Sequence, residues 1–113
     1  KVVEYTVAPV FLSSSGKGGH EWLIEFVEAP KDLEAFANHL DDSLKKVNSD
    51  YEAKRFNNLA LTRLKVQQAI PGTFMNWMKS KNKIGAQQKV PRLSNQRTQL
   101  EELLHIMKNL PNQ

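Results

Sequence analysis

The sequence predicts an α+β domain: a small, mainly antiparallel three-stranded sheet packed with about four helices, in the order β-β-α-α-β-α-α. Two early stretches alternate apolar and polar residues, as strands do. Two longer stretches repeat apolar residues at helical spacing. The chain has 113 residues, of which 40% are hydrophobic and 25% are charged. These values are typical of one ordinary globular domain, which we expect to span residues 1–113.

The first two strands are expected within residues 2–11 and 20–28, joined by a Ser/Gly-rich loop as an antiparallel hairpin. Pro9 has no backbone N–H, so the first strand should lie at an edge of the sheet or end there. Alternation places three residues of each strand on one face: Val3, Tyr5 and Val7, and Trp22, Ile24 and Phe26. Glu21, Leu23 and Glu25 fall on the opposite face of the second strand.

Two helices should follow these strands. Residues 33–47 carry an apolar stripe at helical spacing, and Asp32 precedes them as a plausible N-cap. A second, short helix should begin with the capping box formed by Ser49 and Glu52. We interpret the adjacent acids Asp41 and Asp42 as part of a solvated helix face rather than a catalytic pair.

A third strand is expected within residues 61–70, where Pro71-Gly72 ends it. Thr73 is then expected to cap a helix that directs Phe74, Trp77 and Met78 inward. The last helix is predicted by apolar residues at helical spacing, namely Leu100, Leu103, Leu104, Met107 and Leu110.

The net charge of +4 conceals an asymmetry along the chain. Residues 1–53 contain five Lys or Arg and ten Asp or Glu, whereas residues 54–113 contain eleven Lys or Arg and two acids. The second half is therefore the better candidate for contacts with phosphates, nucleic acid or an acidic protein surface. Basic helix faces that are simply solvated remain the alternative.

Several classes of function are disfavoured. The chain has no cysteine, and its three histidines lack the spacing of a zinc site, so we expect no structural metal. No apolar run is long enough to span a membrane and no signal peptide opens the chain, so we expect a cytoplasmic protein without membrane contact. No hydrolase triad or GxSxG motif is present. Because the first residue is Lys1 rather than methionine and a strand pattern follows at once, we expect a fragment or a processed product.

The segment "IGAQQKVPRL", residues 84–93, has neither helical nor strand periodicity. Pro91 favours an extended backbone at the preceding residue, and Gly85 frees the chain after the third helix. Lys89 and Arg92 are therefore expected on a non-helical segment between two helices. Two cations with few acids nearby suit an oligophosphate, and a plain surface loop is the alternative.

Three stretches, "GGHEWLIEF", "NSDYEAKR" and "GTFMNWMKSKNKIGAQQKVPRLSNQR", carry a resemblance to a known family. Their combined pattern is N-x-x-Y-x-x-x-R, then G-T-F, then Q-x-K-x-P-R. The chain resembles the C-terminal domain of the auxin-responsive-promoter (Gretchen Hagen) family of acyl acid amido synthetases. The likeness runs from about Glu4 to Leu104 and is greater to bacterial-type members than to the plant enzymes. Gln88 and Ala86 depart from residues that are common in the family.

The resemblance implies that this chain is the small C-terminal lid domain of an adenylate-forming ligase. A large N-terminal domain, absent from these 113 residues, would bind ATP, its Mg²⁺ and a carboxylic acid. The carboxylate would be adenylated and then joined to an amine, usually that of an amino acid. The lysine of the Q-x-K-x-P-R motif, here Lys89, would contact ATP phosphates, and Arg92 holds the motif's arginine position. The isolated domain is not expected to be active.

Two other hypotheses remain at the level of sequence. A non-catalytic basic module could bind nucleic acid, although neither an aromatic RNA-binding motif nor a helix-turn-helix pattern is present. A freestanding protein-interaction domain is the third. The resemblance favours small-molecule substrates and the enzyme's own N-terminal domain as partners, and not nucleic acid. It names neither the carboxylic acid nor the amine.

Overall fold

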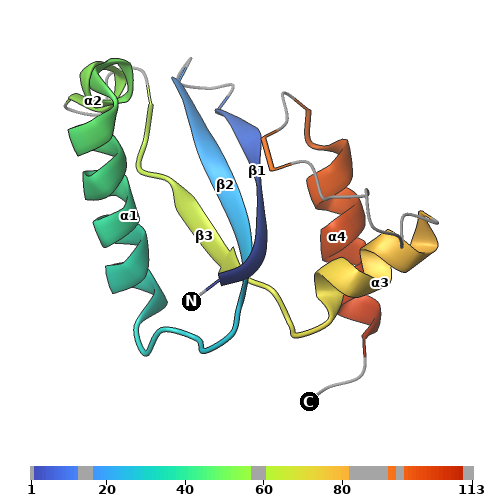
Figure 1. The fold of residues 1–113 in the computed structure, drawn as a ribbon. Coiled ribbons are helices and arrows are strands. Elements are labelled where there is room, and N and C mark those ends of the chain that lie inside the picture. The colour runs from blue at the N-terminus through green and yellow to red at the C-terminus, as the bar shows by residue number, and fades with distance from the viewer. Residues whose placement is uncertain (1, 13–16, 57–60, 82–91, 94–95, 111–113) are drawn as a thin grey trace.

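Three layers form the domain, with a sheet between two pairs of helices (Figure 1). A computed structural model describes residues 2–12, 17–56, 61–81, 92–93 and 96–110. Its elements in chain order are β1 (Val2–Leu12), β2 (Lys17–Phe26), α1 (Leu33–Val47), α2 (Ser49–Arg55), β3 (Lys65–Gln68), α3 (Thr73–Ser80) and α4 (Thr98–Asn109). Helices α1 and α2 lie on one side of the sheet, and α3 and α4 lie on the other. The predicted order of elements is confirmed.

The sheet has the strand order β1-β2-β3. Strands β1 and β2 form the predicted antiparallel hairpin, in which Val7 pairs with Trp22 and Pro9 pairs with His20. Strand β3 pairs with β2 in parallel, so the sheet is mixed rather than wholly antiparallel. The parallel direction follows from the connection, because the chain crosses through α1 and α2 before it re-enters the sheet. Strand β1 lies at an edge, as Pro9 predicts, and continues to Leu12.

The main core lies between the sheet and the pair α3–α4. Its central side chains Leu23, Leu100 and Leu103 are fully buried. Phe74 and Trp77 of α3 face this core, as their spacing predicts. Truncation of one of these leucines to alanine typically costs about 2–5 kcal/mol. Because Leu23 lies on the face of β2 opposite to Trp22, that face of the strand is buried against α3 and α4.

The second side of the sheet is covered by α1. The ring of Phe26 on β2 meets that of Phe36 on α1 edge to face, with 5.2 Å between ring centroids. Because helices cover both faces, the carboxylates of Glu21 and Glu25 lie in buried positions with 5% and 7% of each residue exposed. Ionised groups in such positions need hydrogen-bond partners.

Two of the predicted caps are wrong by one residue. Asp32 caps α1 as expected, because its Oδ1 accepts a hydrogen bond from the Ala35 N–H. Helix α2 is capped by the Asn48 side chain, which accepts from the Tyr51 N–H at 3.0 Å, and not by Ser49. Asn and Ser cap helices about equally well, so propensity alone could not decide which of the adjacent residues Asn48 and Ser49 is the N-cap.

Helix α3 is preceded by Gly72, which has φ of +94°, and not by a capping Thr73. Instead, the Thr73 hydroxyl donates a hydrogen bond to the Ile70 carbonyl at 2.6 Å. The carboxylate of Glu25 accepts from the N–H groups of Gly72 and Phe74 at 3.1 and 3.3 Å. A buried carboxylate on β2 thus accepts from two of the backbone donors at this helix N-terminus.

Asp41 is not on a solvated face, which corrects the sequence interpretation. The residue is 3% exposed and lies between α1 and α2. Its carboxylate accepts hydrogen bonds from Arg55 Nε at 2.9 Å and Nη2 at 2.7 Å, and from the Tyr51 hydroxyl. Asp41, Tyr51 and Arg55, which we call the Asp41 cluster, join the two helices. The neighbouring Asp42 is exposed, as expected.

Candidate functional site

Lys89 lies within residues 82–91, which are outside the described residues, whereas Arg92, the last residue of the same motif, is described. The structure does describe the residues that border this segment on both sides. Lys81 follows the end of α3, and Arg92 lies beside β1. The contacts of Lys81 and Arg92 therefore show which elements the two ends of this segment are attached to.

The border at Lys81 is tied to α4. Lys81 Nζ lies 2.9 Å from Glu102 Oε2, and the indole N–H of Trp77 donates to Glu102 Oε1 at 3.0 Å. One carboxylate on α4 thus contacts both the last turn of α3 and the residue that follows it. The cap at Glu25 holds the other end of the same helix.

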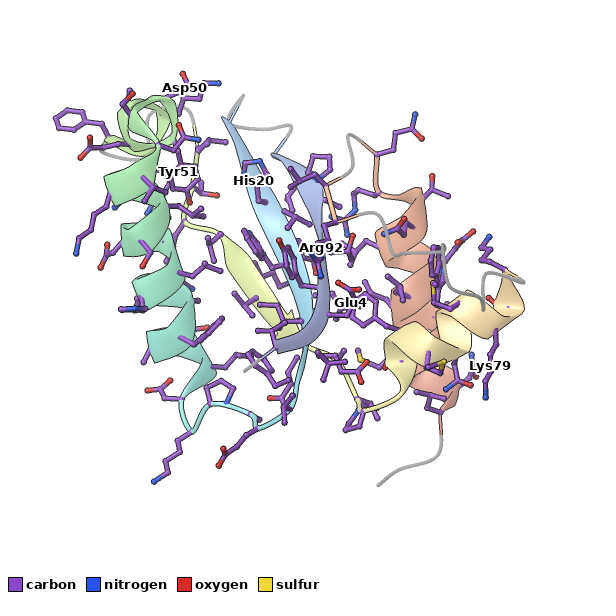
Figure 2. All side chains as sticks on the ribbon, in the orientation of Figure 1. Glu4, His20, Asp50, Tyr51, Lys79 and Arg92 are labelled. Atoms are coloured by element: carbon purple, nitrogen blue, oxygen red, sulfur yellow. The ribbon has the colours of Figure 1, made fainter. Side chains whose placement is uncertain are left out.

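The border at Arg92 is tied to the edge of the sheet. The backbone N–H of Val7 donates to the Arg92 carbonyl at 2.8 Å, and Leu93 forms a parallel bridge with Val7. This contact joins residues that are more than eighty positions apart in the sequence. Figure 2 shows Arg92 and Glu4 next to each other beside β1.

The guanidinium of Arg92 also contacts β1. Arg92 Nε donates to Glu4 Oε1 at 2.9 Å, and the guanidinium carbon lies 5.0 Å from the centroid of the Tyr5 ring. The guanidinium of Arg92 is charged at any physiological pH, and the hydrogen bond to Glu4 raises its pKa further. The Tyr5 ring is itself stacked on Trp22, with 5.5 Å between centroids. We call these contacts of Arg92 and Leu93 with Glu4, Tyr5 and Val7 the β1 anchor.

Sequence reasoning missed a second group of charges, at the start of α4. Arg97 Nη2 donates to Glu21 Oε1 at 2.9 Å, Arg97 Nε donates to Glu101 at 3.0 Å, and Arg97 Nη1 donates to the Pro9 carbonyl at 3.0 Å. The Gln67 amide also donates to Glu21. Burial alone would raise the pKa of Glu21, but the hydrogen bonds from Gln67 and Arg97 lower it below its usual value. In the sequence, only the presence of a glutamate on a strand hinted at this group of charges. Its partners Gln67 and Arg97 are 46 and 76 positions away, so no local pattern connects them to Glu21.

Much of the positive charge in the second half of the chain is paired with acidic side chains of the first half. Five ion pairs join a cation of the basic second half to an acid of the first half: Lys54–Asp50, Arg55–Asp41, Arg63–Glu34, Arg92–Glu4 and Arg97–Glu21. Lys81 pairs with Glu102 of the second half. Most described cations of the second half therefore do not form an unpaired basic surface, which weakens the nucleic-acid hypothesis.

A groove of about 460 Å³ lies between α3 and α4 and is lined by Trp77, Ser80, Lys81, Glu101, Glu102, His105 and Ile106. Its two carboxylates disfavour a polyphosphate at this position. Within the described ranges, no three His, Asp or Glu side chains gather in a way that could hold a metal ion. No helix in the described part of the chain is long and apolar enough to cross a membrane.

Comparison with known proteins supports the resemblance found in the motifs. No curated protein matches the chain. Among solved structures, the "GH3.15 acyl acid amido synthetase" matches with a TM-score of 0.62 and 21% identity over 95% of this chain. The "AtGH3.15 acyl acid amido synthetase in complex with 2,4-DB" matches with a TM-score of 0.59 and 20% identity, again over 95% of this chain. At these sequence identities, the two matches show that the fold is similar and nothing further.

This chain spans 19% of the length of each of those structures. Residues 1–98 match the family model described as "GH3 family C-terminal domain". The resemblance to the Gretchen Hagen family is thereby confirmed, whereas the assignment to its bacterial branch stays a prediction. The chain belongs to the GH3 family and is a C-terminal domain of that family.

Proposed function

We propose that this chain is the C-terminal domain of an ATP-dependent acyl acid amido synthetase. The family match over residues 1–98 is the observation that carries the proposal, and it agrees with the name of the similar solved structures. We further propose that a larger N-terminal domain of the same protein binds ATP and the carboxylic acid, and that the enzyme works in the cytoplasm. The coverage of only 19% of the solved relatives supports such a partner domain.

The proposed reaction has two steps. A carboxylate oxygen of the acyl acid attacks the α-phosphorus of ATP, the bond to the β-phosphate breaks, and pyrophosphate leaves. An amine nitrogen then attacks the acyl carbon of the adenylate, loses its proton and displaces AMP to form an amide. We assign the Mg²⁺ that accompanies ATP to the N-terminal domain, since the described residues offer no cluster of ligands for it.

Lys89 is proposed as the residue that contacts the ATP phosphates during adenylation. Negative charge accumulates on phosphate oxygens as the carboxylate attacks, and an ammonium group directed at those oxygens stabilises that charge. Arg92 is proposed as a second phosphate contact. Its guanidinium has five N–H donors, so a phosphate can share it with Glu4.

The test is carboxylate-dependent exchange of pyrophosphate into ATP by the full-length protein. A panel of carboxylic acids first identifies one that supports exchange. Lys89→Ala should then lower the exchange rate by about 10²–10³-fold, the usual loss for one contact to a developing anion.

Lys79→Ala is the matched control, because it removes the same charge from an exposed position in the last turn of α3 (Figure 2). It should leave the exchange rate within about twofold of wild type. An unchanged rate in Lys89→Ala would refute the role of Lys89. The absence of exchange with every acid tested would argue against adenylation itself.

A further inference from the structure

We infer that the N-terminal domain of the full-length protein docks on the exposed part of the sheet around Val2, Tyr5 and Trp22. We call these three residues the aromatic face. The inference rests on the proposed function, which supplies the N-terminal domain. It adds the surface of this chain that the domain covers.

The strand register places the three residues of the aromatic face on one side of the sheet. Residues that are directly opposite in an antiparallel pair point to the same side. Val2 lies opposite Phe26, which faces α1, and Tyr5 lies opposite Ile24. Side chains alternate along a strand, so Trp22 shares the side of Ile24 and Phe26. The Tyr5 ring is accordingly stacked on the Trp22 ring.

Helix α1 leaves this part of the sheet partly uncovered. It packs along β3, which is the edge strand opposite to β1 (Figure 1). Ile24 and Phe26 are buried, whereas Tyr5 and Trp22 are only half-buried and Val2 is 44% exposed. Exposed apolar side chains that adjoin one another often mark an interaction surface.

The polar tips of the two aromatic rings also lack partners. Among the described residues, none forms a hydrogen bond with the Trp22 indole N–H or the Tyr5 hydroxyl. Because no buried side-chain nitrogen or oxygen of these residues is unsatisfied, both groups reach the surface. Aromatic side chains with an apolar body and a free polar tip are enriched in protein interfaces. A mainly apolar partner surface with oxygen acceptors fits this face.

Arg92 indicates which partner covers the aromatic face. Its guanidinium lies 5.0 Å from the centroid of the Tyr5 ring, and its side chain is 56% exposed. On the proposed function, Arg92 contacts phosphates of the ATP that the N-terminal domain holds. That domain must therefore approach the surface beside Tyr5. A specific interface covers about 800 Å² on each partner, so a domain that reaches Arg92 also covers the adjoining aromatic face.

The covalent connection favours the same partner. In the proposed full-length protein, the N-terminal domain precedes Val2 in the sequence. A tethered partner has a roughly millimolar effective concentration, so even a small apolar face suffices for docking. Val27 adds apolar surface at this end of the sheet, because it is 68% exposed and follows Phe26, the residue paired with Val2.

Hydroxyl-radical footprinting of the full-length protein tests the docking, both without nucleotide and with ATP and Mg²⁺. Mass spectrometry measures the oxidation rate of each side chain, which falls when water is excluded. Val2→Glu adds a charge that docking would bury without a partner. We expect Trp22 and Tyr5 to be oxidised at least about threefold more slowly in wild type than in Val2→Glu, because interface anchors are shielded from water.

Val47→Glu is the matched control, because it makes the same substitution at an exposed valine. Val47 is 81% exposed and ends α1 beside α2, whereas β1 begins at the other end of the domain (Figure 1). This variant should keep the wild-type oxidation rates of the aromatic face. Phe56, which is 65% exposed, should be oxidised equally in all three proteins. If Val2→Glu does not fold, as judged by its melting temperature, Val27→Glu takes its place.

Protection of the aromatic face that Val2→Glu removes and Val47→Glu keeps would support the inference. Equal oxidation in wild type and Val2→Glu, with and without ATP, would overturn it. Protection that increases with protein concentration would overturn it as well, because the partner would then be a second copy of the protein. Pyrophosphate exchange by the same samples tests the proposed function separately. Normal exchange with an unprotected face refutes only the docking, and if no acid supports exchange, the footprint still decides the docking.

Discussion

The Asp41 cluster gives a quantitative prediction for stability. Substitution of Asp41 by Asn keeps the shape of the side chain but removes its charge. Arg55 then stays buried between α1 and α2 without the carboxylate that accepts from its Nε and Nη2. The Tyr51 hydroxyl loses a charged acceptor at the same time.

The pKa of Asp41 gives the size of the stability loss that we expect in Asp41→Asn. Burial would raise that pKa, but hydrogen bonds from Arg55 and Tyr51 outweigh the effect and lower it from 3.8 to about 2. The difference corresponds to about 2–3 kcal/mol in favour of the charged form in the folded state. An unpaired buried charge typically costs about 3–5 kcal/mol, so we expect Asp41→Asn to lose about 3 kcal/mol. A domain of this size has roughly 6–17 kcal/mol of stability, so the loss is easily measured.

The pH dependence provides a second, independent check. Because the pKa of Asp41 is lower in the folded state than in the unfolded state, its contribution is fully present above about pH 5. The contribution is lost as the pH falls through about 4 toward 2. The difference in stability between wild type and Asp41→Asn should therefore shrink over this range.

Urea unfolding of the chain at pH 7, and at intervals down to the lowest pH at which the wild type folds, measures both quantities. Asp42→Asn is the control, since that neighbouring carboxylate is 70% exposed and should matter by less than about 0.5 kcal/mol. A loss below about 1 kcal/mol in Asp41→Asn, or a difference that does not change with pH, would refute the assigned role of the cluster.

Two further predictions concern single residues of the fold. Burial and the hydrogen bond to Asp41 raise the pKa of Tyr51, so the stability that it contributes should be lost as the pH rises above about 10, and Tyr51→Phe should abolish this alkaline loss in urea unfolding. An alkaline transition that is the same in both proteins would contradict this. Gly72→Ala should cost about 1–2 kcal/mol, because φ is +94° while the added Cβ would meet only Asn76 Nδ2 at an ordinary 3.6 Å. Thermal unfolding measures that cost, and a neutral result would contradict the assigned strain.

Hydrophobic periodicity predicted most of the element order, because the longer strands and helices bury a face whose spacing is visible locally. Helix α2, in which only Arg55 is buried, was predicted instead from the capping box of Ser49 and Glu52. The parallel pairing of β3 was not predictable in this way, since Lys65 and Val66 show the same alternation in either direction. What decides the direction is the crossover through two helices, which is a property of the whole fold.

The buried acids show why the polar interior could not be predicted. Asp41, Glu21 and Glu25 resemble surface residues in the sequence, yet each has a partner that is 14 to 76 positions away. Which pairs form depends on how the helices pack on the sheet, and no local pattern encodes it. Lys89 and Arg92 suited an oligophosphate from their position alone, but two cations on a loop are common on any surface, so their specific roles were predicted only through the resemblance.

The β1 anchor links the fold to the proposed chemistry. An exposed edge strand offers unpaired backbone groups to other strands, and proteins usually cover such edges. Along this edge the Tyr5 N–H donates to the Glu4 carboxylate, and the Val7 N–H donates to the Arg92 carbonyl. Pro9, two residues further on, has no N–H to satisfy, and its carbonyl accepts from Arg97. The contacts that cover the edge of β1 therefore also hold Arg92, the proposed phosphate contact. A substitution that opens this edge should expose the strand, so aggregation of the variant is expected.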